Sequence, residues 1–179
     1  MSQIANNYAQ GLYSLARDEG FDKAILDEMA VLDQAFSQEP AYLRLLAAPN
    51  LTKEERCKVL DDSFRGKVQP YLLNFMKLLT EKGYIRHFSD CCKAYRAFYN
   101  QDNGILPVRA VTAVALTQEQ KDKLCKKLES LTGKTVDLTN RVDPEVLGGV
   151  RLDYDGKRVD GTVMNRLDSV RQLLNNTVI

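Results

Sequence analysis

The sequence is poor in the residues that usually bind metals or carry out catalysis. Among its 179 residues there is one histidine, His87, and its cysteines lack the paired spacing of a zinc site or a disulfide framework. The cysteines are Cys57, Cys91, Cys92 and Cys125. We therefore expect free thiols, as in a reducing compartment, and neither a metal nor a cofactor.

An excess of charge of one sign is also absent. The 25 lysine and arginine residues nearly balance 24 aspartate and glutamate residues, which gives a formal net charge of +1. The densest basic cluster is Lys121, Lys123, Lys126 and Lys127. Because Asp122 interrupts it and Glu129 follows it, this cluster is typical of a solvated helix face. Nucleic-acid binding, which usually requires a basic excess or patch, is not expected.

Long hydrophobic runs are missing as well. No uninterrupted apolar stretch approaches the about 20 residues that span a bilayer. Residues 1–7 have neither the basic start nor the apolar core of a secretion signal, and they lack the arginines of an organelle transit peptide. We expect a soluble protein that reaches a membrane only through a partner. A bacterial chain and a processed organelle form both fit this pattern.

The sequence contains fragments of catalytic and ligand-binding motifs, but each fragment lacks a residue that the motif requires. A Ser–His–Asp or Cys–His arrangement would have to use His87, which lies in an apolar helical seam. The Gly-Lys-Thr run at Gly133 lacks the upstream glycine of a phosphate-binding loop, since Leu128 stands there. An EF-hand loop needs its glycine at the sixth position, whereas Gly156 is fourth from Asp153. We expect no catalytic residue and no enzymatic activity.

Helical patterns fill the first 103 residues. Six segments repeat apolar residues every three or four positions, which predicts an all-α six-helix bundle. The first apolar positions of these segments are Ile4, Ile25, Tyr42, Cys57, Leu72 and Ile85. Thr52 and Glu55 have the spacing of a capping box, which predicts the start of the fourth helix.

After Gly104 the pattern becomes mixed. Alternation of apolar and polar residues predicts strands over residues 105–113, 135–139, 150–154 and 157–159. A second capping box at Thr117 and Gln120 predicts a helix that ends at Gly133, and apolar residues at helical spacing predict a terminal helix over residues 163–174. The expected C-terminal domain is therefore a small α+β unit with a short mixed or antiparallel sheet.

The predicted fold class is α+β overall, with a helical domain over residues 1–104 and an α+β domain over residues 105–179. Turn signals surround the last two predicted strands, where Asp155-Gly156 suits a hairpin turn with positive φ. The predicted turn residues are Gly148, Gly149, Asp155, Gly156, Asp160 and Gly161.

Two helices carry more apolar surface than one buried face requires. The segment 70–82 is apolar on nearly all sides, and the first helix combines apolar residues with the small residues Ala9 and Gly11. A groove between these helices could accept an amphipathic helix from a partner. Burial of both faces within the bundle is the alternative, and the residues alone leave both open.

Six motifs, in order along almost the whole chain, resemble the F-type ATP synthase delta subunit, a family related to the mitochondrial oligomycin-sensitivity-conferring protein. They are Asn7–Tyr13, Leu46–Pro49, Asn74–Leu79, Val111–Ala113, Leu147–Val150 and Asp160–Thr162. Each motif is weak alone, but their order and spacing make the set specific. Departures are small: Gly11 replaces a common alanine, and Thr162 stands where serine is usual.

The resemblance implies a non-catalytic stator subunit that links the catalytic head to the peripheral stalk. The N-terminal domain would bind the N-terminal helices of alpha subunits, and the C-terminal domain would bind the peripheral stalk b subunits. The implied groove residues are Tyr8, Leu12, Leu15, Leu72, Phe75, Met76 and Leu79. The implied location is peripheral, on the cytoplasmic face of the cell membrane, or on an organelle inner or thylakoid membrane for a processed form. The alternative is a free-standing helical adaptor or regulatory module that binds amphipathic helices.

Overall fold

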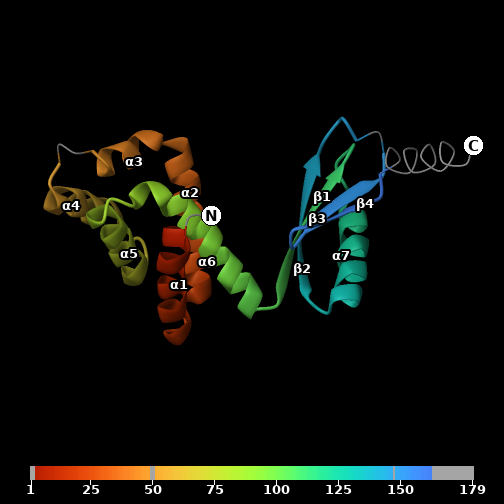
Figure 1. Ribbon diagram of the computed structural model, residues 1–179, viewed down its shortest axis with the longest axis horizontal. Coiled ribbons are helices and arrows are strands. Elements are labelled where there is room, and N and C mark those ends of the chain that lie inside the picture. The colour runs from red at the N-terminus through yellow and green to blue at the C-terminus, as the bar shows by residue number, and fades with distance from the viewer. Residues whose placement is uncertain (1–2, 49–50, 147, 163–179) are drawn as a thin grey trace, which may run out of the picture. The chain divides into compact units, whose positions relative to one another are not determined.

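The computed structural model describes residues 3–48, 51–146 and 148–162. The chain divides into two compact units, residues 1–99 and residues 100–179 (Figure 1). The division falls within the last turn of the helix Phe88–Asp102, and the functional domain boundary at residue 104 stays a prediction. The predicted terminal helix over residues 163–174 lies outside the described residues.

The N-terminal unit contains six α-helices before the first strand, as predicted from the apolar spacing (Figure 1). They are α1 (Gln3–Asp18), α2 (Asp22–Gln38), α3 (Pro40–Leu46), α4 (Lys53–Phe64), α5 (Pro70–Glu81) and α6 (Phe88–Asp102). A short 3-10 turn, η1 (Ile85–His87), precedes α6, so the last predicted helix begins with a tighter turn than the pattern indicated.

Local signals explain where several of these helices begin. The Thr52 hydroxyl accepts a hydrogen bond from the Glu55 amide at 3.2 Å, and the Thr52 amide donates to Glu55 Oε2 at 2.8 Å. This is the predicted capping box, which satisfies two amides that the first turn of α4 leaves without partners. Pro70 opens α5, and the preceding amide of Gln69 donates to Glu28 Oε2 of α2 at 2.8 Å. That bond ties the start of α5 to α2.

The core of this unit is formed by one face of each longer helix. From α1 the buried residues are Ala5, Ala9, Leu12, Tyr13 and Ala16, and from α5 they include Leu72, Leu73, Phe75, Met76 and Leu79. Tyr95 of α6 is fully buried, and its hydroxyl donates to the Asp22 carbonyl at 3.0 Å. The ring of Tyr13 meets the Tyr95 ring edge-on at 5.4 Å, so α1 and α6 share an aromatic contact inside the bundle.

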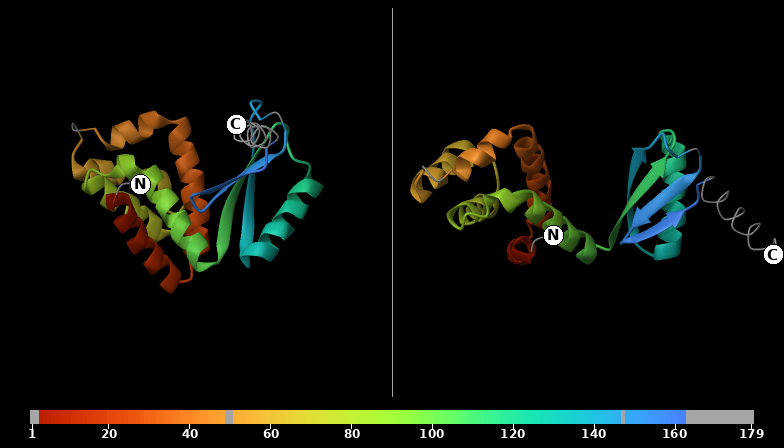
Figure 2. Two further views of the ribbon diagram at one scale, coloured as in Figure 1. Left: turned by 45° about the vertical axis from the view of Figure 1, so that its right-hand side comes forward. Right: turned by 45° about the horizontal axis from the view of Figure 1, so that its top comes forward.

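The C-terminal unit contains a four-stranded mixed sheet, which agrees with the predicted α+β class. Its elements are β1 (Ile105–Thr112), α7 (Gln118–Thr132), β2 (Thr135–Val142), β3 (Val150–Tyr154) and β4 (Lys157–Asp160). The strand order is β2-β1-β3-β4, with β1 parallel to β2 and the other pairs antiparallel. The helix between the parallel strands, α7, lies against one face of the sheet (Figures 1 and 2).

The α7 side of the sheet carries the second hydrophobic core. Leu128 of α7 packs there with alternate residues of the strands, because successive side chains of a strand point to opposite faces. The buried strand residues are Leu106, Val108, Ala110, Val136 and Leu152. The predicted capping box at Thr117 is present: its hydroxyl accepts from the Gln120 amide at 3.3 Å, and its own amide donates to Gln120 Oε1 at 3.0 Å.

The β3–β4 hairpin turns at Asp155 and Gly156, whose φ angles are +48° and +69°. Two positive φ angles in a two-residue loop match the twist of the flanking strands. Before β3, Gly149 has a φ of +84°, and a Cβ atom placed on it would lie 2.5 Å from the Gly161 carbonyl oxygen. After β4, Asp160 Oδ1 accepts from the amide and hydroxyl of Thr162 at 2.9 Å and 2.7 Å. This hydrogen bonding lowers the pKa of the Asp160 carboxyl.

Candidate functional site

An apolar groove of about 370 Å³ lies between α1 and α5 of the N-terminal unit. The lining residues from α1 are Asn7, Tyr8, Gly11, Leu12 and Leu15, and those from α5 are Tyr71, Asn74, Phe75 and Leu78. They recur at intervals of three and four along each helix, so each contributes a single stripe. The two stripes belong to helices that contact each other in the bundle (Figures 1 and 2).

Four of the residues expected in this groove line it: Tyr8, Leu12, Leu15 and Phe75. The other three expected residues, Leu72, Met76 and Leu79, are 0 % exposed and belong to the bundle core. A residue on a helix points about 100° away from its neighbour in sequence. The α5 stripe that faces the groove therefore lies next to the stripe that faces the core, and α5 is apolar on both.

Leu78, Tyr71 and the two asparagines are groove residues that sequence reasoning missed. Residue spacing alone gave no signal, because α5 also buries the adjacent pairs Leu72–Leu73 and Phe75–Met76, so adjacency does not decide whether Leu78 or Leu79 faces outward. In the structure Leu78 is 40 % exposed, and Leu15 on the facing helix is 43 % exposed. Phe21, also exposed, adds to the apolar surface at this side of the bundle, because its ring lies 6.3 Å from the ring of Tyr71.

The groove is suited to packing and not to chemistry. None of its described lining residues is charged, and the polar groups it offers are the amides of Asn7 and Asn74, with the hydroxyls of Tyr8 and Tyr71. Covering such a surface with the apolar face of another helix is favourable, because it removes apolar area from water. The asparagine amides can form hydrogen bonds at its margins.

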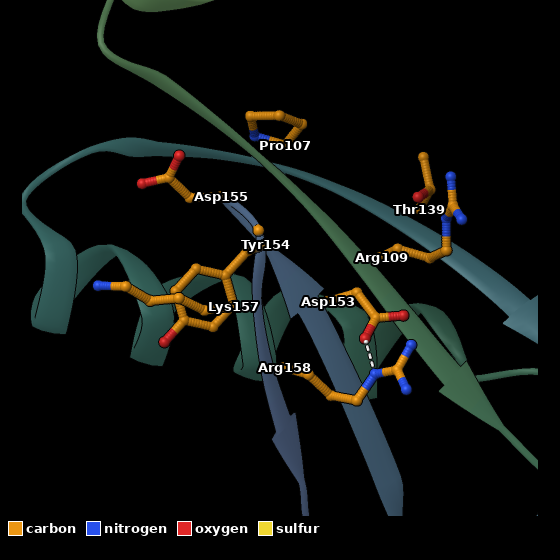
Figure 3. Close-up of a pocket in the computed structure, with 9 residues that line it drawn as sticks. Pro107, Arg109, Thr139, Asp153, Tyr154, Asp155, Lys157 and Arg158 are labelled. Atoms are coloured by element: carbon orange, nitrogen blue, oxygen red, sulfur yellow. Dashed lines mark hydrogen bonds and ion pairs between the residues drawn. The ribbon is translucent and has the colours of Figure 1, made fainter.

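A second hollow, of about 610 Å³, lies on the C-terminal unit (Figure 3). It is lined by Pro107, Arg109, Thr139, Asp153, Tyr154, Asp155, Gly156, Lys157 and Arg158. Thr139, Arg109, Asp153 and Arg158 are paired in register across β2, β1, β3 and β4, so they form one row across the strands.

Charges in this row are only partly neutralised. Arg158 Nε donates to Asp153 Oδ1 at 2.9 Å (Figure 3), and Arg151 Nε lies 3.9 Å from Asp153 Oδ2. Among the described residues the side chain of Arg109 makes no hydrogen bond or ion pair, although it lies on the strand next to Asp153. The hollow therefore offers a guanidinium group to a carboxylate or another acceptor.

The cysteines and the histidine do not form a reactive centre. Burial raises the pKa of the Cys91 thiol to about 11, and burial also raises the pKa of Cys92, whose Sγ donates to the Met29 carbonyl at 3.7 Å. Thiols held protonated in this way are poor nucleophiles. His87 Nδ1 is 3.9 Å from Asp90 Oδ2 in a partly exposed pair. In the described parts of the chain, no three His, Cys, Asp or Glu side chains group as a metal site requires.

Comparisons with known proteins agree along nearly the whole chain. A model of the ATP synthase delta (OSCP) subunit family matches residues 4–174. ATP synthase subunit delta of Lactobacillus gasseri is 31 % identical over 173 residues, covering 96 % of this chain and 94 % of the relative. That of Alkaliphilus oremlandii is 28 % identical over 176 residues, covering 98 % of each.

A solved structure is similar in fold. A chain of the Toxoplasma gondii mitochondrial ATP synthase hexamer gives a TM-score of 0.76 at 16 % identity, with 97 % of this chain and 98 % of that chain covered. Identity this low supports the fold alone. Within the described residues, no helix combines the length and the apolar character needed to cross a bilayer.

Proposed function

Since the chain belongs to the ATP synthase delta (OSCP) subunit family, and is therefore a non-catalytic stator subunit of the F-type ATP synthase, we propose that its two units bind different parts of that complex. The family match confirms the resemblance that the sequence motifs indicated. It also confirms that the protein takes part in ATP synthesis and proton transport as a subunit of this complex. The free-standing adaptor, the alternative left open by the residues, is set aside for the same reason.

We propose that the groove between α1 and α5 holds an amphipathic N-terminal helix of an alpha subunit of the catalytic head. The observation that carries this proposal is the pair of exposed leucines, Leu15 and Leu78, on the two helices that border an uncharged groove. Covering the exposed part of each leucine contributes about 1 kcal/mol, because about two-fifths of each is exposed and full burial of a leucine side chain contributes about 1.5–3 kcal/mol. A stator has to resist rotor torque, and an interface with slow dissociation does so without chemistry.

The C-terminal unit is proposed to bind the peripheral stalk b subunits. The predicted contact surface includes the terminal helix, which lies outside the described residues. Within the described residues, the hollow with Arg109 supports the proposal because an unpaired guanidinium favours an acidic partner. Attachment through the complex also implies a peripheral location at the cytoplasmic face of the cell membrane, or at an organelle inner or thylakoid membrane if the chain is a processed form. The bacterial relatives favour the former.

Calorimetric titration of the full chain with a peptide from the N-terminus of the same organism's alpha subunit tests the groove. A peptide of about 20 residues is long enough to form more than five helical turns. We expect one-to-one binding. Leu15→Asp and Leu78→Asp should each weaken binding by about tenfold or more, because the carboxylate would be desolvated against an apolar helix face.

Val31→Asp is the matched control, because Val31 of α2 is 68 % exposed and does not line the groove. This variant should bind as the wild type does. Circular dichroism of each variant checks that the helices are intact. Wild-type affinity in both Leu15→Asp and Leu78→Asp would contradict the proposed site, and failure of the chain to co-purify with the ATPase would contradict the wider proposal.

A further inference from the structure

Gly11 is a residue that the bundle itself does not require. It lies in the middle of α1, where glycine is among the least favourable residues for a helix. Its φ is not in the left-handed region, so the backbone conformation does not call for glycine. A Cβ atom added to Gly11 would meet no atom within 4 Å, so internal packing does not call for it either. A small residue at this position leaves space outside the bundle.

That space is part of the groove. Gly11 lines it between Tyr8, one turn earlier on α1, and Leu15, one turn later. Tyr8 and Leu15 have large side chains, so the missing side chain at Gly11 leaves a notch in the α1 stripe. In helix–helix packing, a side chain of one helix inserts into a hole formed by residues of the other, and a glycine at the hole lets the two backbones approach closely.

We propose that Gly11 is a specificity-determining residue of the groove, and that its notch receives one large apolar side chain, of the leucine, methionine or phenylalanine class, from the docked alpha-subunit helix. This inference rests on the proposed function of the groove, because it assumes the same occupant. It adds that one position of that helix must be large, and that the helix approaches α1 more closely than any larger residue at position 11 would permit.

The test uses the full chain with Gly11→Ala and Gly11→Leu, titrated with the alpha-subunit peptide. Gly11→Ala should leave the melting temperature unchanged or raise it, because it removes a helix-interior glycine and its Cβ meets no atom within 4 Å. For Gly11→Leu we expect the same, because Gly11 is exposed and leucine is a good helix former. Gly11→Leu should weaken binding by about tenfold or more, as expected for overpacking of a close-packed contact, and Gly11→Ala by less. A variant that is at least as stable as the wild type but binds more weakly separates the notch from a general loss of structure.

Gln10→Leu is the matched control. Gln10 is an exposed neighbour on α1 that does not line the groove, so the same added side chain should leave the affinity unchanged. Peptides in which each apolar residue is replaced in turn by alanine extend the test to a double-mutant cycle. We expect one alanine-substituted peptide to bind the wild-type protein more weakly than the parent peptide binds it. The same peptide should bind the Gly11→Leu variant at least as tightly as the parent peptide binds that variant.

The outcomes distinguish the inference from the function on which it rests. If Gly11→Leu binds the parent peptide as the wild type does while Leu15→Asp does not, the notch is overturned and the groove remains. If the wild type fails to bind, or Leu15→Asp and Leu78→Asp both bind normally, the proposed groove is overturned and the notch with it. Equal weakening by Gln10→Leu and Gly11→Leu would also overturn the notch, because the effect would then not depend on the groove.

Discussion

Separate replacement of the neighbouring leucines Leu78 and Leu79 by alanine measures how α5 divides its two apolar faces. Leu79 is 0 % exposed, and truncation to alanine removes about three carbon groups worth about 0.8 kcal/mol each, to which a cavity term is added. We expect Leu79→Ala to lower the free energy of unfolding by about 3–4 kcal/mol, within the range found for buried leucines. Urea unfolding followed by far-ultraviolet circular dichroism measures this change.

Leu78→Ala should behave differently although it alters the same side chain one residue earlier. Leu78 is 40 % exposed and borders an open groove, so a fraction of the transfer term is lost and no closed cavity is left. The expected loss is about 1 kcal/mol. A difference of about 2–3 kcal/mol between the variants is therefore expected. Equal losses at the two positions, or a larger loss for Leu78→Ala, would refute the assignment of Leu79 to the core and Leu78 to the groove.

Two further predictions concern the glycine turn and a helix cap. Gly149→Ala should lower the free energy of unfolding by about 2 kcal/mol or more, because the position has a positive φ and the added Cβ would lie 2.5 Å from the Gly161 carbonyl oxygen. Gly156→Ala is the control: this position has a φ of +69° but no close atom, so the loss should be about 1 kcal/mol. Equal losses for the two variants in thermal unfolding would contradict the steric clash at Gly149. Hydrogen bonds from Thr52 lower the pKa of the Glu55 carboxyl below its ordinary value of 4.5. The ionised carboxylate therefore stabilises the folded state fully above pH 4.5, and this contribution is lost as the pH falls through the lower pKa of the folded state. The difference in melting temperature between the wild type and Glu55→Ala should become smaller as the pH falls through this range, and a difference that grows in acid would contradict the role of the cap.

Local features were the ones most fully predictable from the sequence. Both capping boxes depend on residues three positions apart, so Thr52 and Thr117 could be placed without knowledge of the fold. The six helices followed from apolar spacing for the same reason. Strand order was not predictable in this way, because the pairing of β1 with both β2 and β3 depends on contacts between distant segments.

The groove shows the same limit. The resemblance placed seven residues at the groove, and four of them line it: Tyr8, Leu12, Leu15 and Phe75. The other three, Leu72, Met76 and Leu79, lie in the core, because the rotation of α5 about its axis turns them toward the bundle. An apolar helix has no sequence signal for which of two apolar stripes faces inward. The partner-binding roles of all these residues remain proposals that the titrations address.

The strand order of the C-terminal unit has a mechanical consequence. The chain passes from α6 to β1 through Asn103 and Gly104, so tension carried along the backbone enters the sheet at Ile105. The entering strand is central, paired with β2 over eight positions from Ile105 to Thr112 and with β3 over five. A force along β1 acts parallel to the strand and is shared by all the hydrogen bonds between β1 and its two neighbours, so these bonds have to break together. In an edge strand pulled away perpendicular to its axis, the inter-strand hydrogen bonds would instead break one after another. In a stator subunit, which resists rotor torque, the incoming chain is thus anchored on the central strand of the sheet.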